Sequence, residues 1–231
     1  MPNRFTRACY ALAAGVAVTT ALGLTSVGAA SASTTHNKPN ATPSCGPFCI
    51  NPYTAKYGPG YVLQNYRARG NVGNPLKLQF ASNTAPGQDW SIYLQGSVRR
   101  FVRLGLVSPR LGLHYGREPA YELEWAPLGV TTGLCQGTSS PAANGRKVNL
   151  QVCGNNADTV WVLDFRDAPY VGFVPVIAGS TTNFSQPQVL TAGTPPTEPL
   201  FTFRLRYYTT AGAVANNQNW WAFPGMIGPA I

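Results

Sequence analysis

Glu122 and Glu124 are the two carboxylates whose spacing could support catalysis. Glycoside hydrolysis uses two carboxyl groups, an acid and a base or nucleophile, on either side of the scissile bond. The two glutamates lie two residues apart in Tyr-Glu-Leu-Glu-Trp, so on a β-strand they would share one face. Same-face glutamates on one strand are more typical of a solvated surface, and we expect that placement here.

Histidine-dependent and nucleophilic chemistry has little support in the sequence. The two histidines, His36 and His114, do not lie at ligand spacing from any cysteine pair, which argues against a zinc site. The sequence contains no Gly-x-Ser-x-Gly nucleophile elbow and no His-Glu-x-x-His helix. We therefore expect a non-catalytic protein with no metal site and no cofactor.

Arg99, Arg100 and Arg103, with Arg110 nearby, form a basic cluster in a chain of formal net charge +9. On a strand, Arg99 and Arg103 would face one way and Arg100 the other. An anionic envelope polymer is one partner for such charges, and a solvated edge strand that resists aggregation is the other interpretation. The arginines are not interleaved with stacking aromatics in a recognisable motif, so nucleic acid is not an expected partner.

The N-terminal region has the pattern of a secretory signal peptide. Arg4 and Arg7 precede an uncharged Ala/Leu/Val/Gly/Thr-rich run that ends in Ala-Ser-Ala32. An uncleaved membrane anchor is the alternative, but the small-residue ending favours cleavage after Ala32. We expect a signal peptide over 1–32, a disordered leader over the polar residues 33–44 and one domain over 45–231. The mature protein should be an extracellular monomer without a membrane span.

Four cysteines remain after Cys9 is removed with the signal peptide: Cys45, Cys49, Cys135 and Cys153. An even number of cysteines in an oxidising compartment predicts two disulfides. Three pairings are possible. We favour the two local pairs, Cys45 with Cys49 and Cys135 with Cys153, because each lies within one segment.

Composition and periodicity both predict an all-β fold. The chain has 24 glycines and 20 prolines, which interrupt helices, and its aromatic residues are as frequent as its charged ones, at 11% each. The alternation of Val148, Leu150 and Val152 with polar residues places three apolar side chains on one face, as in a half-buried strand.

Internal similarity is the most informative feature of the chain. Three copies of a turn, a short alternating strand, a polar loop and an aromatic-led second strand are found at 71–92, 144–163 and 183–203. Their leading aromatics are Trp90, Trp161 and Phe201. A fainter copy spans 111–125, and Gln218-Asn-Trp220 repeats the Gln-x-Trp spacing of Gln88-Asp-Trp90.

These residues resemble the ricin B-type lectin family, β-trefoils marked by a recurring Gln-x-Trp motif. The match is most specific from Gly133 to Phe165, where the family joins the two cysteines of one repeat, here Cys135 and Cys153. The resemblance implies a β-trefoil in which Trp90 and Trp161 are packing residues, with Gln88 and Trp220 as further residues of the structural motif. The chain is also similar to a group of secreted actinobacterial proteins of unassigned activity that share the opening Asn-Pro-Tyr-Thr-Ala-Lys-Tyr-Gly-Pro-Gly of residues 51–60.

The chain departs from the family's sugar-binding pattern at three positions. Gly137 stands where the family has an Asp two residues after the first cysteine, and Asp158 and Gly87 stand where it has an Asn before Gln-x-Trp. A trefoil also has three lobes, yet Trp90 and Trp161 are too far apart for one lobe. The segment Arg99–Trp125 is therefore either a degenerate lobe or an insertion.

From this resemblance we expect a secreted binding module for a carbohydrate or cell-envelope glycan. The predicted ligand residues are Asn155, Asn156 and Asp158 in one loop, or Asn217 and Gln218 in another. The alternatives are a protein-binding trefoil, such as a protease inhibitor with an exposed loop, and a structural envelope protein without a discrete ligand.

Overall fold

The structure, a computed structural model, describes residues 50–166, 172–206 and 214–221. The strands are β1 (Tyr61–Asn65), β2 (Leu76–Phe80), β3 (Trp90–Ser97), β4 (Pro119–Trp125), β5 (Leu134–Thr138), β6 (Arg146–Val152), β7 (Trp161–Leu163), β8 (Phe173–Ala178), β9 (Gln188–Thr191), β10 (Phe201–Arg204) and β11 (Asn219–Trp221). The α-helices are α1 (Val98–Arg103) and α2 (Pro109–Tyr115), and short 3-10 turns cover Gly58–Gly60, Tyr66–Ala68, Pro86–Gln88, Pro127–Gly129 and Asn216–Gln218. The predicted signal peptide and leader, with Cys45 and Cys49, lie outside the described residues.

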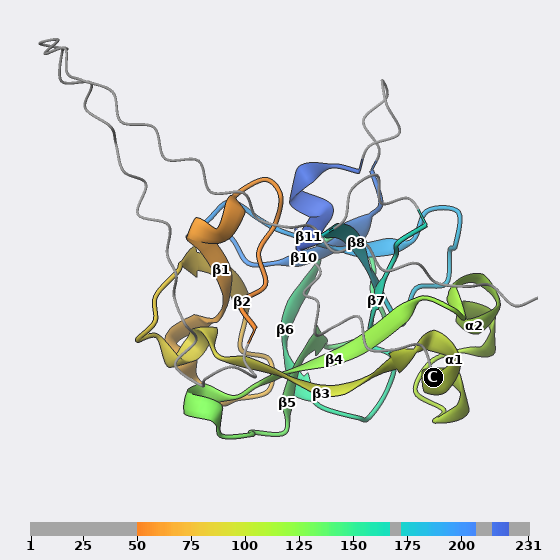
Figure 1. The fold of residues 1–231 in the computed structure, drawn as a ribbon, viewed down its shortest axis with the longest axis horizontal. Helices are drawn as coiled ribbons and strands as arrows, with labels where there is room; N and C mark the ends of the chain where they lie inside the picture. The colour runs from red at the N-terminus through yellow and green to blue at the C-terminus, as the bar shows by residue number, and fades with distance from the viewer. Residues whose placement is uncertain (1–49, 167–171, 207–213, 222–231) are drawn as a thin grey trace, which may run out of the picture. The chain divides into compact units, whose positions relative to one another are not determined.

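Strands β3, β4, β7, β8 and β11 pair antiparallel in that order around a barrel (Figure 1). The segment from Ile50 to Thr54 closes the ring, because Ile50 pairs with Trp90 of β3 and Thr54 pairs with Trp220 of β11. Closure leaves the barrel without a free sheet edge.

Three hairpins, β1–β2, β5–β6 and β9–β10, complete the architecture. Each hairpin also meets the other two. The pairs that join them are Pro75 with Asn149, Lys147 with Phe201, and Lys77 with Pro199. A closed barrel with three mutually paired hairpins is a β-trefoil, so the expected all-β trefoil fold is confirmed.

The pairings define three lobes: lobe 1 over 50–97, lobe 2 over 119–163 and lobe 3 over 173–221. Our bounds for the third copy were wrong. In lobe 3, the residue equivalent to Trp90 and Trp161 is Trp220. Phe201 lies in a hairpin strand, β10, rather than in a barrel strand. The faint copy at 111–125 is not a lobe, because it combines part of α2 with β4, the first strand of lobe 2.

The three tryptophans that lead the barrel strands make equivalent contacts. Trp90, Trp161 and Trp220 are at most 2% exposed, and each donates its indole Nε1–H to a backbone carbonyl of its own lobe's hairpin. The acceptors are Leu63, Gln136 and Leu190, at 3.1, 2.9 and 2.9 Å. One such bond per lobe gives the fold its pseudo-threefold repeat, and the predicted packing role of Trp90 and Trp161 is confirmed.

The segment between β3 and β4 is helical, so the expectation of a basic strand was wrong. Ser108 caps α2 by accepting the amide of Leu111 at 3.2 Å, and Pro109 occupies the first turn. Val98 and Phe101 of α1 lie three residues apart and are buried together with Leu111. Helical spacing thus turns one apolar side of each short helix toward the sheet.

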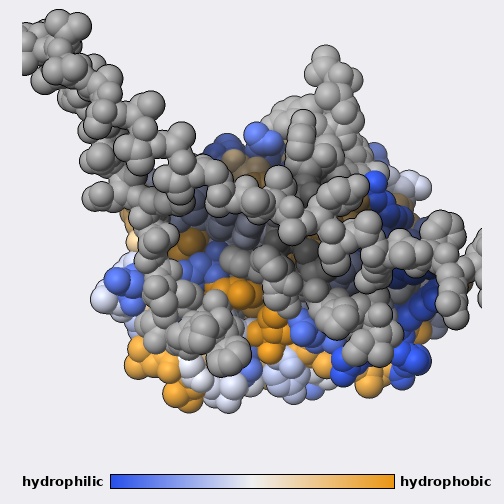
Figure 2. Space-filling view, in the orientation of Figure 1, coloured by the Kyte–Doolittle hydropathy of each residue, from blue (hydrophilic) through white to orange (hydrophobic). Residues whose placement is uncertain are grey.

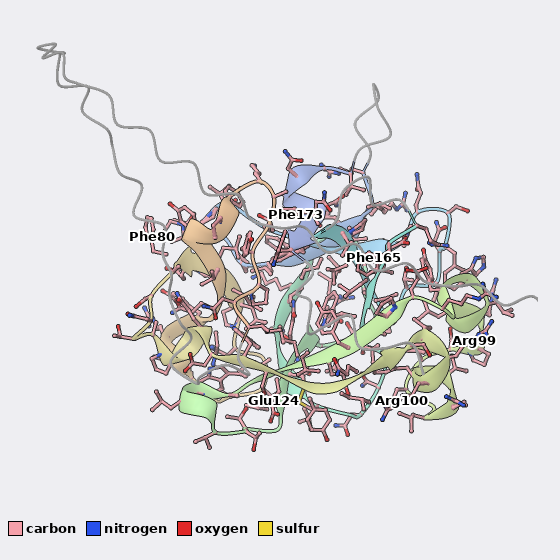
Figure 3. The ribbon with its side chains drawn as sticks, in the orientation of Figure 1. Phe80, Arg99, Arg100, Glu124, Phe165 and Phe173 are labelled. Atoms are coloured by element: carbon pink, nitrogen blue, oxygen red, sulfur yellow. A yellow bond between two sulfur atoms is a disulfide. The ribbon has the colours of Figure 1, made fainter. Side chains whose placement is uncertain are left out.

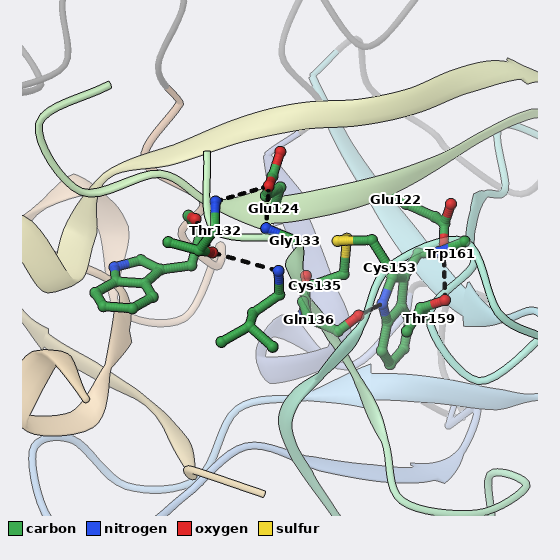
Figure 4. The surroundings of a disulfide bond; sticks show 12 residues. Glu122, Glu124, Thr132, Gly133, Cys135, Gln136, Cys153, Thr159 and Trp161 are labelled. Atoms are coloured by element: carbon green, nitrogen blue, oxygen red, sulfur yellow. Dashed lines mark hydrogen bonds between the residues drawn. A yellow bond between two sulfur atoms is a disulfide. The ribbon is translucent and has the colours of Figure 1, made fainter. Parts of the chain in front are cut away.

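A disulfide joins Cys135 of β5 to Cys153, directly after β6 (Figure 4). The predicted Cys135–Cys153 pairing is therefore confirmed. Strand register places buried Val62 and Val189 where Cys135 stands, and Ala81 and Leu205 follow the partner strands where Cys153 does. Lobes 1 and 3 thus carry apolar residues at the positions that lobe 2 joins by a disulfide, and in lobe 3 the two belong to one buried cluster.

Candidate functional site

In lobes 1 and 3, the glutamine of the Gln-x-Trp motif closes the loop after the hairpin. In lobe 1, Gln88 is 1% exposed; its Oε1 accepts the amide of Ser82 at 2.8 Å and its Nε2 donates to the carbonyl of Phe80 at 2.7 Å. A second donation reaches Gln64 Oε1 at 3.0 Å. A buried amide that is bonded on both sides holds this loop against the barrel.

Gln218 makes the same contacts in lobe 3. Its Oε1 accepts the amide of Arg206 at 2.8 Å, and its Nε2 donates to the carbonyl of Arg204 at 3.0 Å and to Thr191 Oγ1 at 3.1 Å. The side chain is 1% exposed. Gln218, which we predicted as a ligand residue, therefore occupies the structural position of its motif.

Lobe 2 replaces this glutamine with a glutamate from another strand. Thr159 stands at the motif position, and Glu122 of β4 accepts the amide of Gly154 at 2.9 Å and the hydroxyl of Thr159 through Oε1 (Figure 4). Gly154 follows β6 as Ser82 follows β2 and Arg206 follows β10, so the bond is equivalent in all three lobes. Sequence analysis missed this role, although Thr159 in the glutamine position was its signal.

Glu122 and Glu124 do not lie on a solvated face, so that expectation was wrong. They are 0% and 3% exposed, and Glu124 Oε1 accepts the backbone amides of Thr132 and Gly133 at 2.9 and 2.6 Å (Figure 4). Each carboxylate thus accepts backbone amides of a separate loop through its Oε1. Each glutamate pins a loop to the barrel.

The predicted residues Asn155, Asn156 and Asp158 lie together in the loop after the disulfide. Asn156 Oδ1 accepts the amide of Asp158 at 2.9 Å, which makes a local turn, and both asparagines are exposed. The loop packs closely on Gly137, where an added Cβ would lie 2.8 Å from the carbonyl oxygen of Asp158. The family's Asp has no room at this position.

Asn217 lies in a different setting, on a groove of about 320 Å³ that we call the lobe 3 groove. Its lining residues are Lys56, Tyr57, Thr191, Ala192, Gly193, Thr194, Glu198, Phe201, Phe203, Arg206, Asn217 and Gln218. The structure thus brings both predicted residues of this loop to one groove, with Asn217 partly exposed beside buried Gln218.

Phe201 and Phe203 give the lobe 3 groove its aromatic wall. Their ring centroids are 5.7 Å apart with an interplanar angle of 57°, and the guanidinium of Arg206 lies 5.8 Å from the Phe203 ring. Strand register matches these positions to Lys77 and Gln79 in lobe 1, and to Asn149 and Gln151 in lobe 2. Lobe 3 is therefore the lobe whose hairpin carries rings at both positions.

A turn at 193–198 forms the rim of the groove. Glu198 Oε2 accepts the amide of Thr194 at 2.7 Å, and lobe 1 holds the turn from outside through Lys77 Nζ and Gln79 Nε2, which donate to the carbonyls of Thr197 and Pro196 at 2.7 and 2.8 Å. The hydrogen bonds from Thr194, followed by attraction to Lys56, lower the pKa of Glu198. The rim thus carries a carboxylate that is ionised at neutral pH and held in place by Thr194.

Comparisons with known proteins were made for the whole chain. No family model and no curated protein sequence matches it. Among solved structures, it is similar to a designed three-fold symmetric protein, ThreeFoil, with 15% identity, a TM-score of 0.48 and coverage of 76% of this chain and 97% of that one. It is also similar to a mosquitocidal holotoxin, with 14% identity and a TM-score of 0.46, over 74% of this chain but only 16% of the toxin. The trefoil assignment rests on the strand pairings and equivalent contacts given above.

Proposed function

We propose that this protein is a non-catalytic carbohydrate-binding module whose ligand occupies the lobe 3 groove. The observation that carries the proposal is the Phe201–Phe203 wall beside Asn217, Glu198 and Arg206. A sugar presents an apolar C–H face and polar hydroxyl edges, so it is recognised by a ring together with hydrogen-bonding groups. Both kinds of group line this one groove.

The polar groups of the groove suit a polyhydroxyl ligand. The Glu198 carboxylate accepts hydrogen bonds, the Arg206 guanidinium donates them, and the Asn217 amide can do both. The groove is also held in shape before a ligand arrives, because Gln218 fixes its floor and lobe 1 fixes its rim. Preorganised groups lose less freedom on binding.

Binding without catalysis is proposed because of how the carboxylates are distributed. Glycoside hydrolysis requires two carboxyl groups across the scissile bond. Among the residues that line the lobe 3 groove, Glu198 is the single carboxylate. Glu122 and Glu124 are buried and bonded to loop amides.

Secretion and an extracellular setting belong to this proposal. The Cys135–Cys153 disulfide supports it, because disulfides persist in oxidising compartments. In the part of the chain that the structure describes, no helix has the length and apolarity needed to cross a bilayer. A glycan or envelope polymer met outside the cell is the proposed partner of a monomer.

A glycan array with the purified protein tests the carbohydrate proposal. We expect a defined set of glycans to bind, and Phe203→Ala to weaken that binding at least about ten-fold, because it removes the stacking surface. Gln151→Ala, at the matching position of lobe 2, is the control and should bind as the unaltered protein does.

Two results would contradict this proposal. One is a folded protein that binds no glycan, with folding checked by near-ultraviolet circular dichroism. The other is equal loss of binding in Phe203→Ala and Gln151→Ala. A protein recovered from culture supernatant by pull-down, together with protease inhibition, would instead indicate the protein-binding alternative.

A further inference from the structure

The α1–α2 segment is an addition to the trefoil. The chain connects β3 to β4 through residues 98–118, whereas the equivalent connection from β7 to β8 spans only 164–172. The barrel pairings on either side of the two connections are alike. The longer connection therefore exceeds what the fold needs.

The inner side of this segment is anchored to the barrel. Phe101 and Leu111, both fully buried, belong to one apolar cluster with Val160, Val162 and Ile177 of lobe 2 and lobe 3. Such packing fixes two helices that are too short to be stable alone. Their outer side is then presented to solvent in a defined arrangement.

The outer side carries a concentration of uncompensated positive charge. Arg99, Arg100, Arg103, Arg110 and Arg117 are all exposed, and the one acidic residue of 98–118 is Glu118, whose Oε2 accepts the amide of Phe165. Within 50–166, 172–206 and 214–221, the single ion pair joins Arg166 to Asp164. Arg99 and Arg103 lie one turn apart on α1, so their like charges repel each other and destabilise the helix. A bound anion would relieve this repulsion.

A groove of about 500 Å³ lies between the two helices. It is lined by Ser97, Arg99, Val102, Arg103, Pro109, Gly112 and Leu113. Arg99 projects toward α2, whereas Arg100 lies on the β3 side and donates to the carbonyl of Gln95 at 2.9 Å (Figure 3). The groove therefore gathers two of the five arginines.

Leu113 lies beside these arginines with 85% of its side chain exposed. Leu104, at the end of α1, is 53% exposed. Figure 2 shows hydrophobic and strongly hydrophilic surface side by side over this part of the molecule. The combination of arginines with protruding leucines distinguishes this surface from a merely soluble basic face.

We propose that the α1–α2 surface docks on an anionic phospholipid bilayer. Lipid phosphates would bind between Arg99 and Arg103, and Leu113 would enter the boundary between headgroups and acyl chains. Interfacial binding combines electrostatic attraction to anionic lipids with burial of apolar side chains, and this surface offers both. A soluble anionic polymer would engage the arginines but would leave Leu113 exposed to water, so the leucine favours the bilayer.

Vesicle co-sedimentation of the purified protein without the predicted signal peptide, residues 1–32, tests this docking surface. We expect binding to vesicles that contain phosphatidylglycerol, little binding to phosphatidylcholine alone, and weaker binding as salt is raised. Arg99→Gln with Arg103→Gln should weaken binding about five-fold per charge removed. Leu113→Ser should weaken it about ten-fold without changing the charge.

Arg146→Gln with Lys147→Gln is the matched control, since it removes two exposed charges from β6. It should reduce binding much less than the α1 pair does. Equal losses in the two double variants, or equal binding to both kinds of vesicle, would overturn the proposal. Binding to soluble polyphosphate that needs Arg99 and Arg103, without binding to vesicles, would overturn it in favour of an anionic polymer. Glycan binding through Phe203 should be unchanged in all α1–α2 variants.

Discussion

At the scale of single residues, lobe 2 keeps a hydrogen bond that the other lobes make, although a different residue accepts it. Gln88 and Gln218 reach their loops from within their own motif, but Glu122 reaches Gly154 from a neighbouring barrel strand. The accepted amide is the common element. The residue that accepts it is replaceable, provided that a buried acceptor arrives at the same point.

This substitution can be tested by a double-mutant cycle. We expect Glu122→Ala to lower the free energy of unfolding by about 1–3 kcal/mol, because the amide of Gly154 loses its buried acceptor. Thr159→Gln restores the motif glutamine and should recover part of that loss only when Glu122 is absent. Urea denaturation measures all four proteins. If the effects of the two substitutions on the free energy of unfolding were additive, Glu122 would not be acting in place of the glutamine.

Glu198 allows a prediction about the pH dependence of glycan binding. The hydrogen bonds from Thr194, followed by the charge of Lys56, lower its pKa below the ordinary 4.5, so the carboxylate stays ionised as pH falls through that value. Glycan affinity should therefore be constant from neutral pH to about 4.5 and decline only below it. Calorimetric titration across this range provides the measurement. Glu198→Gln should remove the acidic decline, and an early decline near pH 6 would exclude Glu198 as its cause.

At the scale of elements, the β5–β6 hairpin is the one whose closure is covalent among the described hairpins. Cys135 and Cys153 are separated by 18 residues in sequence, and a cross-link over a loop of this length restricts the unfolded chain by about 3 kcal/mol. The matching apolar pair of lobe 3, Val189 and Leu205, shows that the position also accepts packing alone.

We therefore expect Cys135→Ala with Cys153→Ala to fold with a free energy of unfolding lower by about 3 kcal/mol. Cys135→Val with Cys153→Leu, which copies the lobe 3 pair, should recover part of this loss by filling the space. Guanidinium denaturation under oxidising conditions compares the two. A Val/Leu variant no more stable than the Ala/Ala variant would mean that the lobes are not interchangeable here.

At the scale of the whole molecule, the sequence predicted the architecture better than the lobe boundaries. Two stretches of sequence were sufficient to predict the fold: Gln88-Asp-Trp90 and the Gly133–Phe165 repeat. Both contain residues whose buried contacts recur from lobe to lobe. Phe201 was mistaken for a barrel aromatic because Phe-Thr-Phe alternates as a strand of either kind would. Period-two alternation identifies a strand but not its place in the sheet.

The candidate site was harder to predict for a related reason. Asn217 was found because it belongs to a motif, whereas Phe201 and Phe203 read as core residues in an alternating strand. Their exposure on a groove depends on the turn at 193–198 and on Lys56 and Tyr57 from a distant segment. Glu122 and Glu124 likewise become buried through loops that fold back from elsewhere in lobe 2.

The unequal hairpins have a consequence for valency. Rings occupy both matched positions in lobe 3, while lobes 1 and 2 present Lys77, Gln79, Asn149 and Gln151 there, so one of the three described hairpins offers the proposed glycan site. If the proposed function holds, a protein with one such site cannot cross-link particles, so it would coat a glycan surface without agglutinating it. Avidity would have to come from a second kind of attachment on the same chain.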